Sequence, residues 1–248
     1  IGRWIAKGGR DRMVLATKVT GGGRSEVRGG APISAAVLRS AVEGSLKRLQ
    51  TDYIDLYQLH WPNRGSYHFR QIWTYAPPKV DPDAVTDHML DVLHTAADLI
   101  AEGKIRHIGL SNETPWGVHR FLHLADKHGW PRVVSIQNPY NLLNRSFEVG
   151  LAEIAIREQC GLLAYSPLAF GFLSGKYEGG ARPRKGRLSL YSRFSRYFNA
   201  QSEAACSRYV ALAREHGLDP AQMALAFVTQ QPFVTSNIIG ATTLEQLD

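Results

Sequence analysis

Six apolar segments of this chain, which we interpret as strands, each end in polar residues that can bind a ligand or take part in catalysis. These residues are Lys18, His60, Ser111 with Asn112, Gln137 with Asn138, Tyr165 with Ser166, and Gly240 with Thr242. In a parallel α/β barrel the carboxyl ends of all strands meet at one mouth, where the loops build the active site. The pattern therefore predicts one site assembled from six strands.

The strands alternate with segments that have helical periodicity. We expect helices over about 34–49, 83–102, 115–128, 147–159 and 200–216, another opened by Asp219 and Pro220, and a last strand over 236–239. Strands that alternate with helices of ten or more residues imply parallel βαβ units. The sequence thus predicts an α/β fold, in which residues 1–248 form a single, partial (β/α)8 TIM barrel domain.

The two ends of the chain suggest that the barrel is incomplete. Eight strands would require two more upstream of Ile1, and the helical pattern that begins at Leu244 is cut off at Asp248. We therefore expect the first strands and the C-terminal segment of the barrel to be missing from these 248 residues.

Composition places the chain among ordinary globular proteins, with 44% hydrophobic and 21% charged residues. We find no run of about 18 apolar residues and no basic-then-apolar leader, so we expect no membrane association and a cytoplasmic location. The two cysteines show no metal-ligand spacing and fit free thiols. A net charge of +7 suggests an anionic ligand or nucleic acid without choosing between them.

Each candidate residue taken alone has a structural explanation that the sequence leaves open. Lys18 could extend its ammonium to solvent, and His60 could be a hydrogen-bonded core histidine. Ser111 or Asn112 could cap the helix that follows, and a turn alone explains Tyr165 and Ser166.

A strongly basic stretch follows the fifth strand. It contains Arg182, Arg184, Lys185, Arg187, Arg193 and Arg196. Guanidinium groups bind phosphate through paired hydrogen bonds, although most such runs are solvated loops and one could instead follow a nucleic-acid backbone. Its place after a barrel strand favours a small phosphorylated ligand, and we rank nucleic-acid binding below it.

Several spaced motifs over nearly all of the chain resemble the aldo-keto reductase family. They are Leu15 to Lys18, Asp52 to Leu56 leading to His60-Trp61-Pro62, Gly103 to Arg106 leading to Ser111-Asn112, Gln137 to Tyr140, and Tyr165 to Leu168. Residues 141–145 and 219–224 resemble more narrowly the Tas-like bacterial branch, which is also similar to potassium-channel β subunits. The resemblance implies a (β/α)8 barrel that binds NADPH and reduces aldehyde or ketone carbonyls of small molecules without a metal.

The resemblance also assigns roles to individual residues. It implies catalytic roles for Lys18 and His60, whereas the family's catalytic Asp and Tyr match no residue of this chain, so that the chain alone is expected to be inactive. It implies that the cofactor is bound by Ser111, Asn112, Gln137, Tyr165, Ser166, Pro167, Leu168, Gly171, Lys176, Arg187, Gly240, Thr242 and Gln246.

A second hypothesis uses the same cofactor residues. The protein would be a regulatory or redox-sensing subunit that binds NADPH with little turnover. The sequence names neither the substrate nor the oligomeric state, although the aromatic residues in the loop 63–79 suggest a bulky or aromatic carbonyl compound.

Overall fold

The structure of the chain, a computed structural model, describes residues 1–69 and 71–246. Its contacts divide the chain into two compact units, Ile1–Ile136 and Gln137–Asp248, and each is described here by itself.

The first unit is built on parallel strands that neighbour one another in chain order. They are β1 (Ala16–Val19), β2 (Ile54–Leu59), β3 (Ile105–Ser111) and β4 (Val133–Gln137). In the register of the parallel pairs, Lys18 lies opposite Gln58, and Gln58 lies opposite Gly109. The register therefore brings the C-terminal ends of β1, β2 and β3 to one edge of the sheet.

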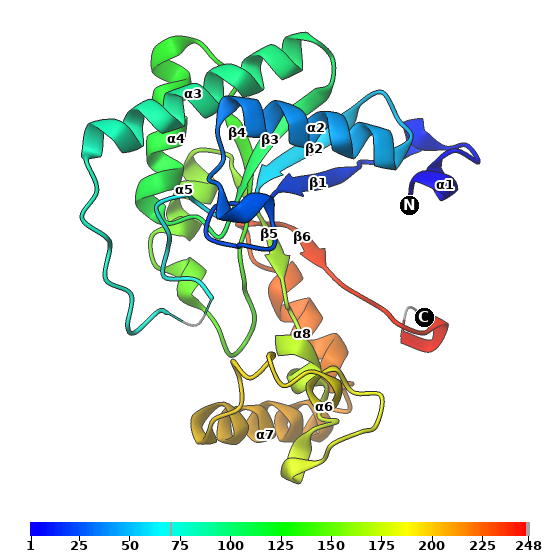
Figure 1. The fold of residues 1–248 in the computed structure, drawn as a ribbon. Helices are drawn as coiled ribbons and strands as arrows, with labels where there is room; N and C mark the ends of the chain where they lie inside the picture. Colours follow the sequence, from blue (N-terminus) through cyan, green and yellow to red (C-terminus); the bar gives the residue numbers. More distant parts are fainter. Residues whose placement is uncertain (70, 247–248) are drawn as a thin grey trace. The chain divides into compact units, whose positions relative to one another are not determined.

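Helices cover one face of these strands, where α2, α3 and α4 lie together (Figure 1). The helices of the unit are α1 (Gly2–Ile5), α2 (Ala35–Leu49), α3 (Pro82–Ala101) and α4 (Pro115–His128), with 3-10 turns at Arg10–Arg12 and Arg28–Gly30. The core between helices and strands is apolar, and Leu38, Val92, Leu99 and Ile108 are almost completely buried in it.

The helix starts follow the capping residues of the sequence. Ser34 Oγ accepts the Val37 amide at 3.3 Å, which confirms the predicted start of α2. Asp81 caps α3 ahead of Pro82, so that helix begins one residue before the predicted Asp83. A side chain that accepts an otherwise unpaired amide fixes the helix start.

The second unit contains one parallel strand pair, β5 (Gly161–Tyr165) and β6 (Val234–Ile238). Its helices are α5 (Leu151–Arg157), α6 (Arg187–Leu190), α7 (Ala200–Glu215) and α8 (Pro220–Thr229), with 3-10 turns at Ser146–Glu148, Ala169–Ser174, Glu178–Gly180 and Leu244–Gln246. Asp219 caps α8 through the Gln222 amide at 2.9 Å, as the sequence predicts.

Three expectations about this unit need correction. The helix predicted over 147–159 is a 3-10 turn followed by the shorter α5, because Gly150 adopts a φ of 86° between them. The last strand begins at Val234 rather than Ser236. Of the helical pattern from Leu244, only Leu244–Gln246 is described, as a 3-10 turn, and residues 247–248 lie outside the described part.

The predicted fold class is confirmed. The chain is an α/β protein whose strands and helices alternate as in a (β/α)8 barrel. In the described part of the chain, no helix combines the length and the apolar character that a bilayer crossing requires. A single barrel domain over 1–248 stays a prediction.

Candidate functional site

Lys18 is half-buried near the end of β1 and faces the neighbouring strand. Its ammonium donates to Oε1 of Gln58 at 3.1 Å, and the Gln58 side chain is completely buried. Burial lowers the pKa of Lys18 below its ordinary value. The ammonium therefore does not simply extend to solvent, because a neutral amide holds it at the edge where the strands end.

His60 follows β2 directly and shares this edge. Burial first, then the positive charges of Lys18 and Arg24, lower the pKa of His60 to about 4. The imidazole is consequently neutral at pH 7 and keeps one N–H for donation. The His60 amide donates to the carbonyl of Val19, the residue after Lys18, at 2.9 Å, so the two predicted catalytic residues lie at neighbouring positions of this edge.

Ser111 and Asn112 come next along the same edge, and both are buried. The Asn112 amide donates to the His60 carbonyl oxygen at 3.0 Å and to Ser111 Oγ at 3.2 Å. Neither residue caps α4, because Thr114 Oγ1 accepts the Gly117 amide instead. The helix-cap alternative is therefore wrong, and Asn112 links β3 to His60.

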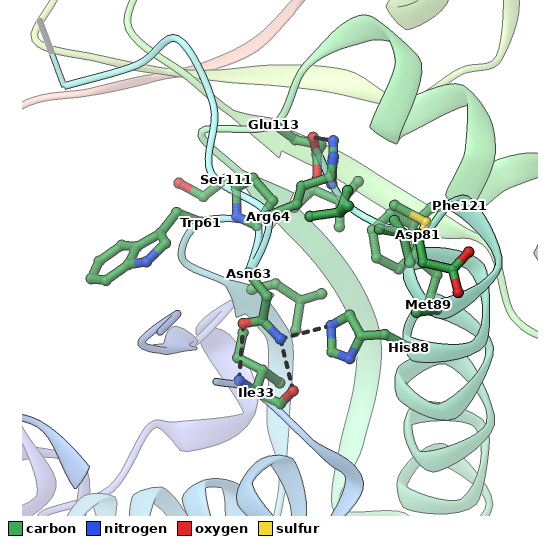
Figure 2. Close-up of a pocket in the computed structure, with 16 residues that line it drawn as sticks. Ile33, Trp61, Asn63, Arg64, Asp81, His88, Met89, Ser111, Glu113 and Phe121 are labelled. Atoms are coloured by element: carbon green, nitrogen blue, oxygen red, sulfur yellow. Dashed lines mark hydrogen bonds and ion pairs between the residues drawn. The ribbon is translucent and has the colours of Figure 1, made fainter. Parts of the chain in front are cut away.

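Trp61 holds the loop beside His60 through close packing and a hydrogen bond. Its ring centroid lies 4.6 Å from that of His60, and its Nε1 donates to the Gly22 carbonyl at 3.0 Å. A Cβ at Gly21 would overlap the indole ring. Trp61 and Ser111 also border a cavity that faces α3 (Figure 2).

Gln137, the first residue of the second unit, is the last residue of β4, and Tyr165 of the same unit ends β5, as the sequence predicts. Burial raises the pKa of Tyr165 to about 12, although the charge of Arg196 acts in the opposite direction. Tyr165 therefore stays neutral and offers an aromatic ring at the end of its strand.

The segment after Tyr165 has a backbone suited to close approach by an anion. Ser166, Ala169, Phe170 and Gly171 all have positive φ, of 58°, 48°, 63° and 91°. A Cβ at Gly171 would lie 3.0 Å from Nζ of Lys176, so the glycine leaves room beside the ammonium. Backbone turns of this kind next to a cation are a feature of anion-binding sites in proteins.

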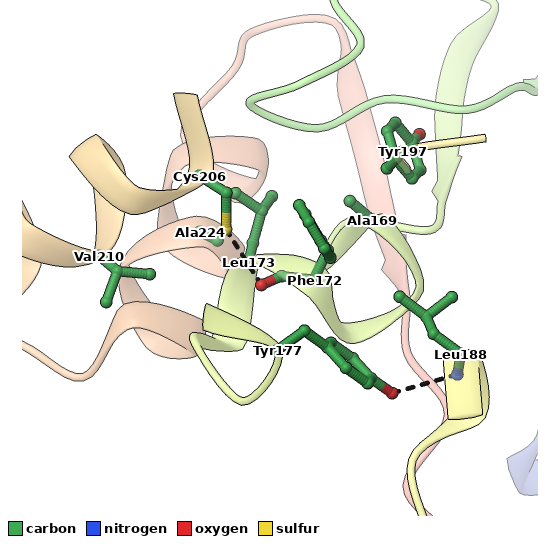
Figure 3. Packing of buried hydrophobic residues seen from close by; sticks show 9 residues of the cluster. All are labelled: Ala169, Phe172, Leu173, Tyr177, Leu188, Tyr197, Cys206, Val210 and Ala224. Atoms are coloured by element: carbon green, nitrogen blue, oxygen red, sulfur yellow. Dashed lines mark hydrogen bonds between the residues drawn. The ribbon is translucent and has the colours of Figure 1, made fainter. Parts of the chain in front are cut away.

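An apolar cluster anchors this segment (Figure 3). Phe172, Leu173 and Tyr177 pack with Val210 and Cys206. The Cys206 thiol also donates to the Phe172 carbonyl at 3.2 Å. The packing holds the backbone that precedes Lys176, whose side chain is exposed.

The basic stretch is interleaved with aromatic rings. The guanidinium of Arg187 lies 5.6 Å from the centroid of Phe194, that of Arg182 4.4 Å from Phe198, and that of Arg196 5.8 Å from Phe170. These are cation–π distances. Arg187 is exposed, so it remains accessible to an anion.

The remaining predicted residues lie beyond β6. Gly240 and Thr242 are exposed, and Gln246 Oε1 accepts from both the amide and the hydroxyl of Thr242 at 2.9 and 3.0 Å. They form a small turn of their own.

Sequence reasoning overlooked Gln58. It is, with Asp55, one of two polar residues in the buried strand β2, one strand away from Lys18, and that position was the available signal. Its role depends on the register of β1 against β2, which the sequence alone does not contain.

Comparison with known proteins gives the family. The model of the aldo/keto reductase family matches residues 1–248. This chain belongs to the aldo/keto reductase family.

Relatives in this family differ in their similarity to the chain. Protein tas of Escherichia coli is 53% identical over all of the chain and 71% of its own length. An aldo-keto reductase of Babesia bovis is 39% identical over 95% of the chain and 87% of that protein, and an uncharacterized oxidoreductase of Bacillus subtilis, YrpG, is 34% identical over all of the chain and 69% of that protein. Membership places the chain among oxidoreductases and agrees with the resemblance found in the sequence motifs.

Proposed function

We propose that the protein reduces aldehyde or ketone carbonyls of small molecules to alcohols, with NADPH as the electron donor. The observation that supports the proposal is the placement of Lys18 and His60 at neighbouring strand ends, where the His60 amide donates to the Val19 carbonyl at 2.9 Å and the lysine charge helps to lower the histidine pKa. A cation beside a neutral imidazole suits a reaction in which negative charge develops on a carbonyl oxygen.

Each predicted cofactor residue has a role in this proposal. Ser111, Asn112 and Gln137 supply hydroxyl and amide groups for the nicotinamide carboxamide, and Tyr165 supplies a ring for stacking. The turn at 166–171 with Lys176 and Arg187 suits the phosphates, and Gly240, Thr242 and Gln246 would lie at the adenosine end. When bound, NADPH supplies the hydride for the carbonyl carbon.

The two catalytic candidates have separate roles in this proposal. His60 donates a hydrogen bond from its neutral ring to the substrate oxygen and orients it. The Lys18 ammonium stabilises negative charge beside that oxygen and lowers the pKa of a phenolic proton donor next to it. The family's Tyr and Asp match no residue of 1–248, so we expect these residues alone to bind NADPH and to turn over slowly.

The test measures NADPH oxidation with 4-nitrobenzaldehyde, and NADPH fluorescence on binding, in the protein that carries this chain. We expect Lys18→Met and His60→Ala to lower kcat by about 10²–10⁴-fold, the usual contribution of general acid–base groups, with little change in NADPH affinity. Lys47→Met is the matched control, because Lys47 is an exposed residue in the last turn of α2 and is not one of the proposed site residues.

The outcomes separate the hypotheses. Unchanged carbonyl-dependent oxidation in both variants contradicts the proposal. Saturable NADPH binding without oxidation, in a form that includes the family's Tyr and Asp, favours the regulatory or redox-sensing subunit instead. Both cysteines of the described chain are buried as thiols, which supports the cytoplasmic location we propose.

A further inference from the structure

A cavity of about 250 Å³ lies between the strands and α3 in the first unit (Figure 2). Its walls are mainly apolar and come from β2, β3, α3, α4 and the loops that precede α2 and follow β2 and β3. They include Ile33, Leu59, Val85, Met89, Leu110 and Phe121. Neither Lys18 nor His60 lines it, whereas Ser111, which we assign to the cofactor, does.

The leucines of this cavity wall and the Lys18 side chain lie on opposite faces of the same strands, whereas Trp61 and Ser111 border the cavity from the Lys18 edge. Lys18 and Gln58 are paired in register and their side chains meet, so they share one face. Leu59 and Leu110 are likewise paired with each other and are one residue out of step with Gln58. Because successive strand residues point to opposite faces, the leucines face the helices while Gln58 faces away from them.

The polar groups around the cavity neutralise or satisfy one another. Arg64 forms an ion pair with Glu113, with 3.2 Å between Nη1 and Oε2. Asn63 accepts the Ile33 amide at 2.9 Å and donates to the Ile33 carbonyl and to His88 Nε2, both at 2.9 Å. Burial lowers the pKa of His88, so its ring is neutral at pH 7. The exception is Asp81, an exposed carboxylate that caps α3 through the Asp83 amide, so among the described residues the wall presents no unpaired positive charge to a ligand.

We propose that this cavity is a second small-molecule site, which binds an uncharged, mostly apolar compound of about two fused rings. An apolar cavity of about 150 Å³ engineered in another protein binds benzene, so the larger volume here suits a bicyclic molecule. Met89 and Phe121 supply an adaptable thioether and an aromatic ring for such a compound. An anion would have to be desolvated beside Glu113, which already pairs with Arg64, the one guanidinium among the described residues of the wall.

The test uses two probes with the same ring system and different charge, 1-naphthol and 1-naphthoate, in titration calorimetry at pH 7. We expect 1-naphthol to bind at one site, with an affinity at least tenfold higher than that of 1-naphthoate, whether or not NADPH is saturating. Equal affinity for the two probes, no binding of 1-naphthol to folded protein, or its displacement by NADPH overturns the proposal.

Cavity-filling variants locate the binding. Val85→Phe on α3 is expected to weaken 1-naphthol binding at least tenfold, whereas Val149→Phe, at an exposed position outside the cavity, leaves it unchanged. Ala84→Phe, at an exposed position of α3 that also borders the cavity, gives the same test if Val85→Phe fails to fold. Undiminished binding in the folded variants contradicts the proposal. Because these readouts do not involve turnover, they fail or succeed independently of the reductase activity.

Discussion

The two ends of strand β2 differ in how their buried charges are paired. At its N-terminal end, Asp55 is only 7% exposed and accepts from Arg10 and Arg106, each at 2.7 Å, and from the Leu15 amide at 2.9 Å. At its C-terminal end, the Lys18 ammonium meets the neutral amide of Gln58, and His60 is kept uncharged beside it.

The pKa values express the same contrast. Burial raises the pKa of Asp55, but the Leu15 amide and the two guanidinium groups lower it by more, so its net pKa lies below the ordinary value. Burial lowers the pKa of Lys18, and among the described residues no acidic partner raises it again. The difference teaches that the first end is arranged to hold the fold, whereas the second retains a cation that an anionic group can still use.

The N-terminal end also uses an aromatic ring to hold its cations. The Tyr53 ring lies 3.8 Å from the guanidinium of Arg10 and 4.2 Å from that of Arg106. The carboxylate and the ring together surround Arg10, whose side chain is 13% exposed.

The largest effect on stability is expected from Asp55→Ala. This variant leaves Arg10 buried without its carboxylate, and breaking such a pair costs about 3 kcal/mol in the free energy of unfolding. Urea unfolding followed by circular dichroism measures the loss. Asp52→Ala, an exposed aspartate at the start of the same segment, should change stability by less than about 0.5 kcal/mol. Equal losses in the two variants would contradict a stabilising role for the buried pairing of Asp55 with Arg10.

A smaller loss of stability is expected from Gly21→Ala, which tests whether the C-terminal end of β2 is held by the close packing of Trp61. The added Cβ would overlap the Trp61 indole and lie 2.6 Å from the Trp61 carbonyl oxygen. Overpacking of this kind costs about 1–3 kcal/mol, and a change in near-ultraviolet circular dichroism should accompany it. The control is Gly240→Ala, because a Cβ there has no neighbour within 4 Å. If Gly21→Ala were as stable as wild type, close packing of Trp61 against Gly21 would not be what holds this end of the strand.

The pH dependence of stability distinguishes the two ends of β2, because His60 and Asp55 titrate over different pH ranges. The folded pKa of His60 is about 4 against an ordinary 6.5, so between these values only the unfolded chain takes up the proton, and stability falls as pH is lowered. After allowance for solvent screening of a half-buried ring, this loss is about 1 kcal/mol. Asp55 affects stability only at lower pH, because its contribution to the free energy of unfolding is complete above its ordinary pKa of 3.8 and is lost as the pH falls further.

Urea unfolding at pH 7 and at pH 4.5 of wild type and His60→Asn measures this prediction. The variant should lose less stability than wild type over that range, since its side chain does not titrate. An identical loss in both proteins would mean that His60 has an ordinary pKa.

The sequence predicts local features of this molecule well. The cap at Ser34, the Asp219-Pro220 start and the polar residues at strand ends all depend on neighbours within a few positions. Even so, the cap of α4 is Thr114 rather than Ser111 or Asn112, because Asn112 is turned back to His60.

Other features depend on residues that are far apart in the chain. Asp55 meets Arg10 and Arg106 across separations of 45 and 51 residues, and Lys18 meets Gln58 across 40. Periodicity does not encode such pairings, because they arise from strand register and packing. The break before α5 is local, but one glycine with positive φ within a helical pattern does not by itself indicate a helix end.

The most direct test of the contrast is the free energy of unfolding of Lys18→Met. Methionine keeps the apolar stem and removes an ammonium that burial disfavours. If the cation is retained for a ligand rather than for the fold, the variant is as stable as wild type within about 1 kcal/mol, or more stable. A loss of about 3 kcal/mol, equal to that of Asp55→Ala, would show instead that both ends of the strand serve the fold alike.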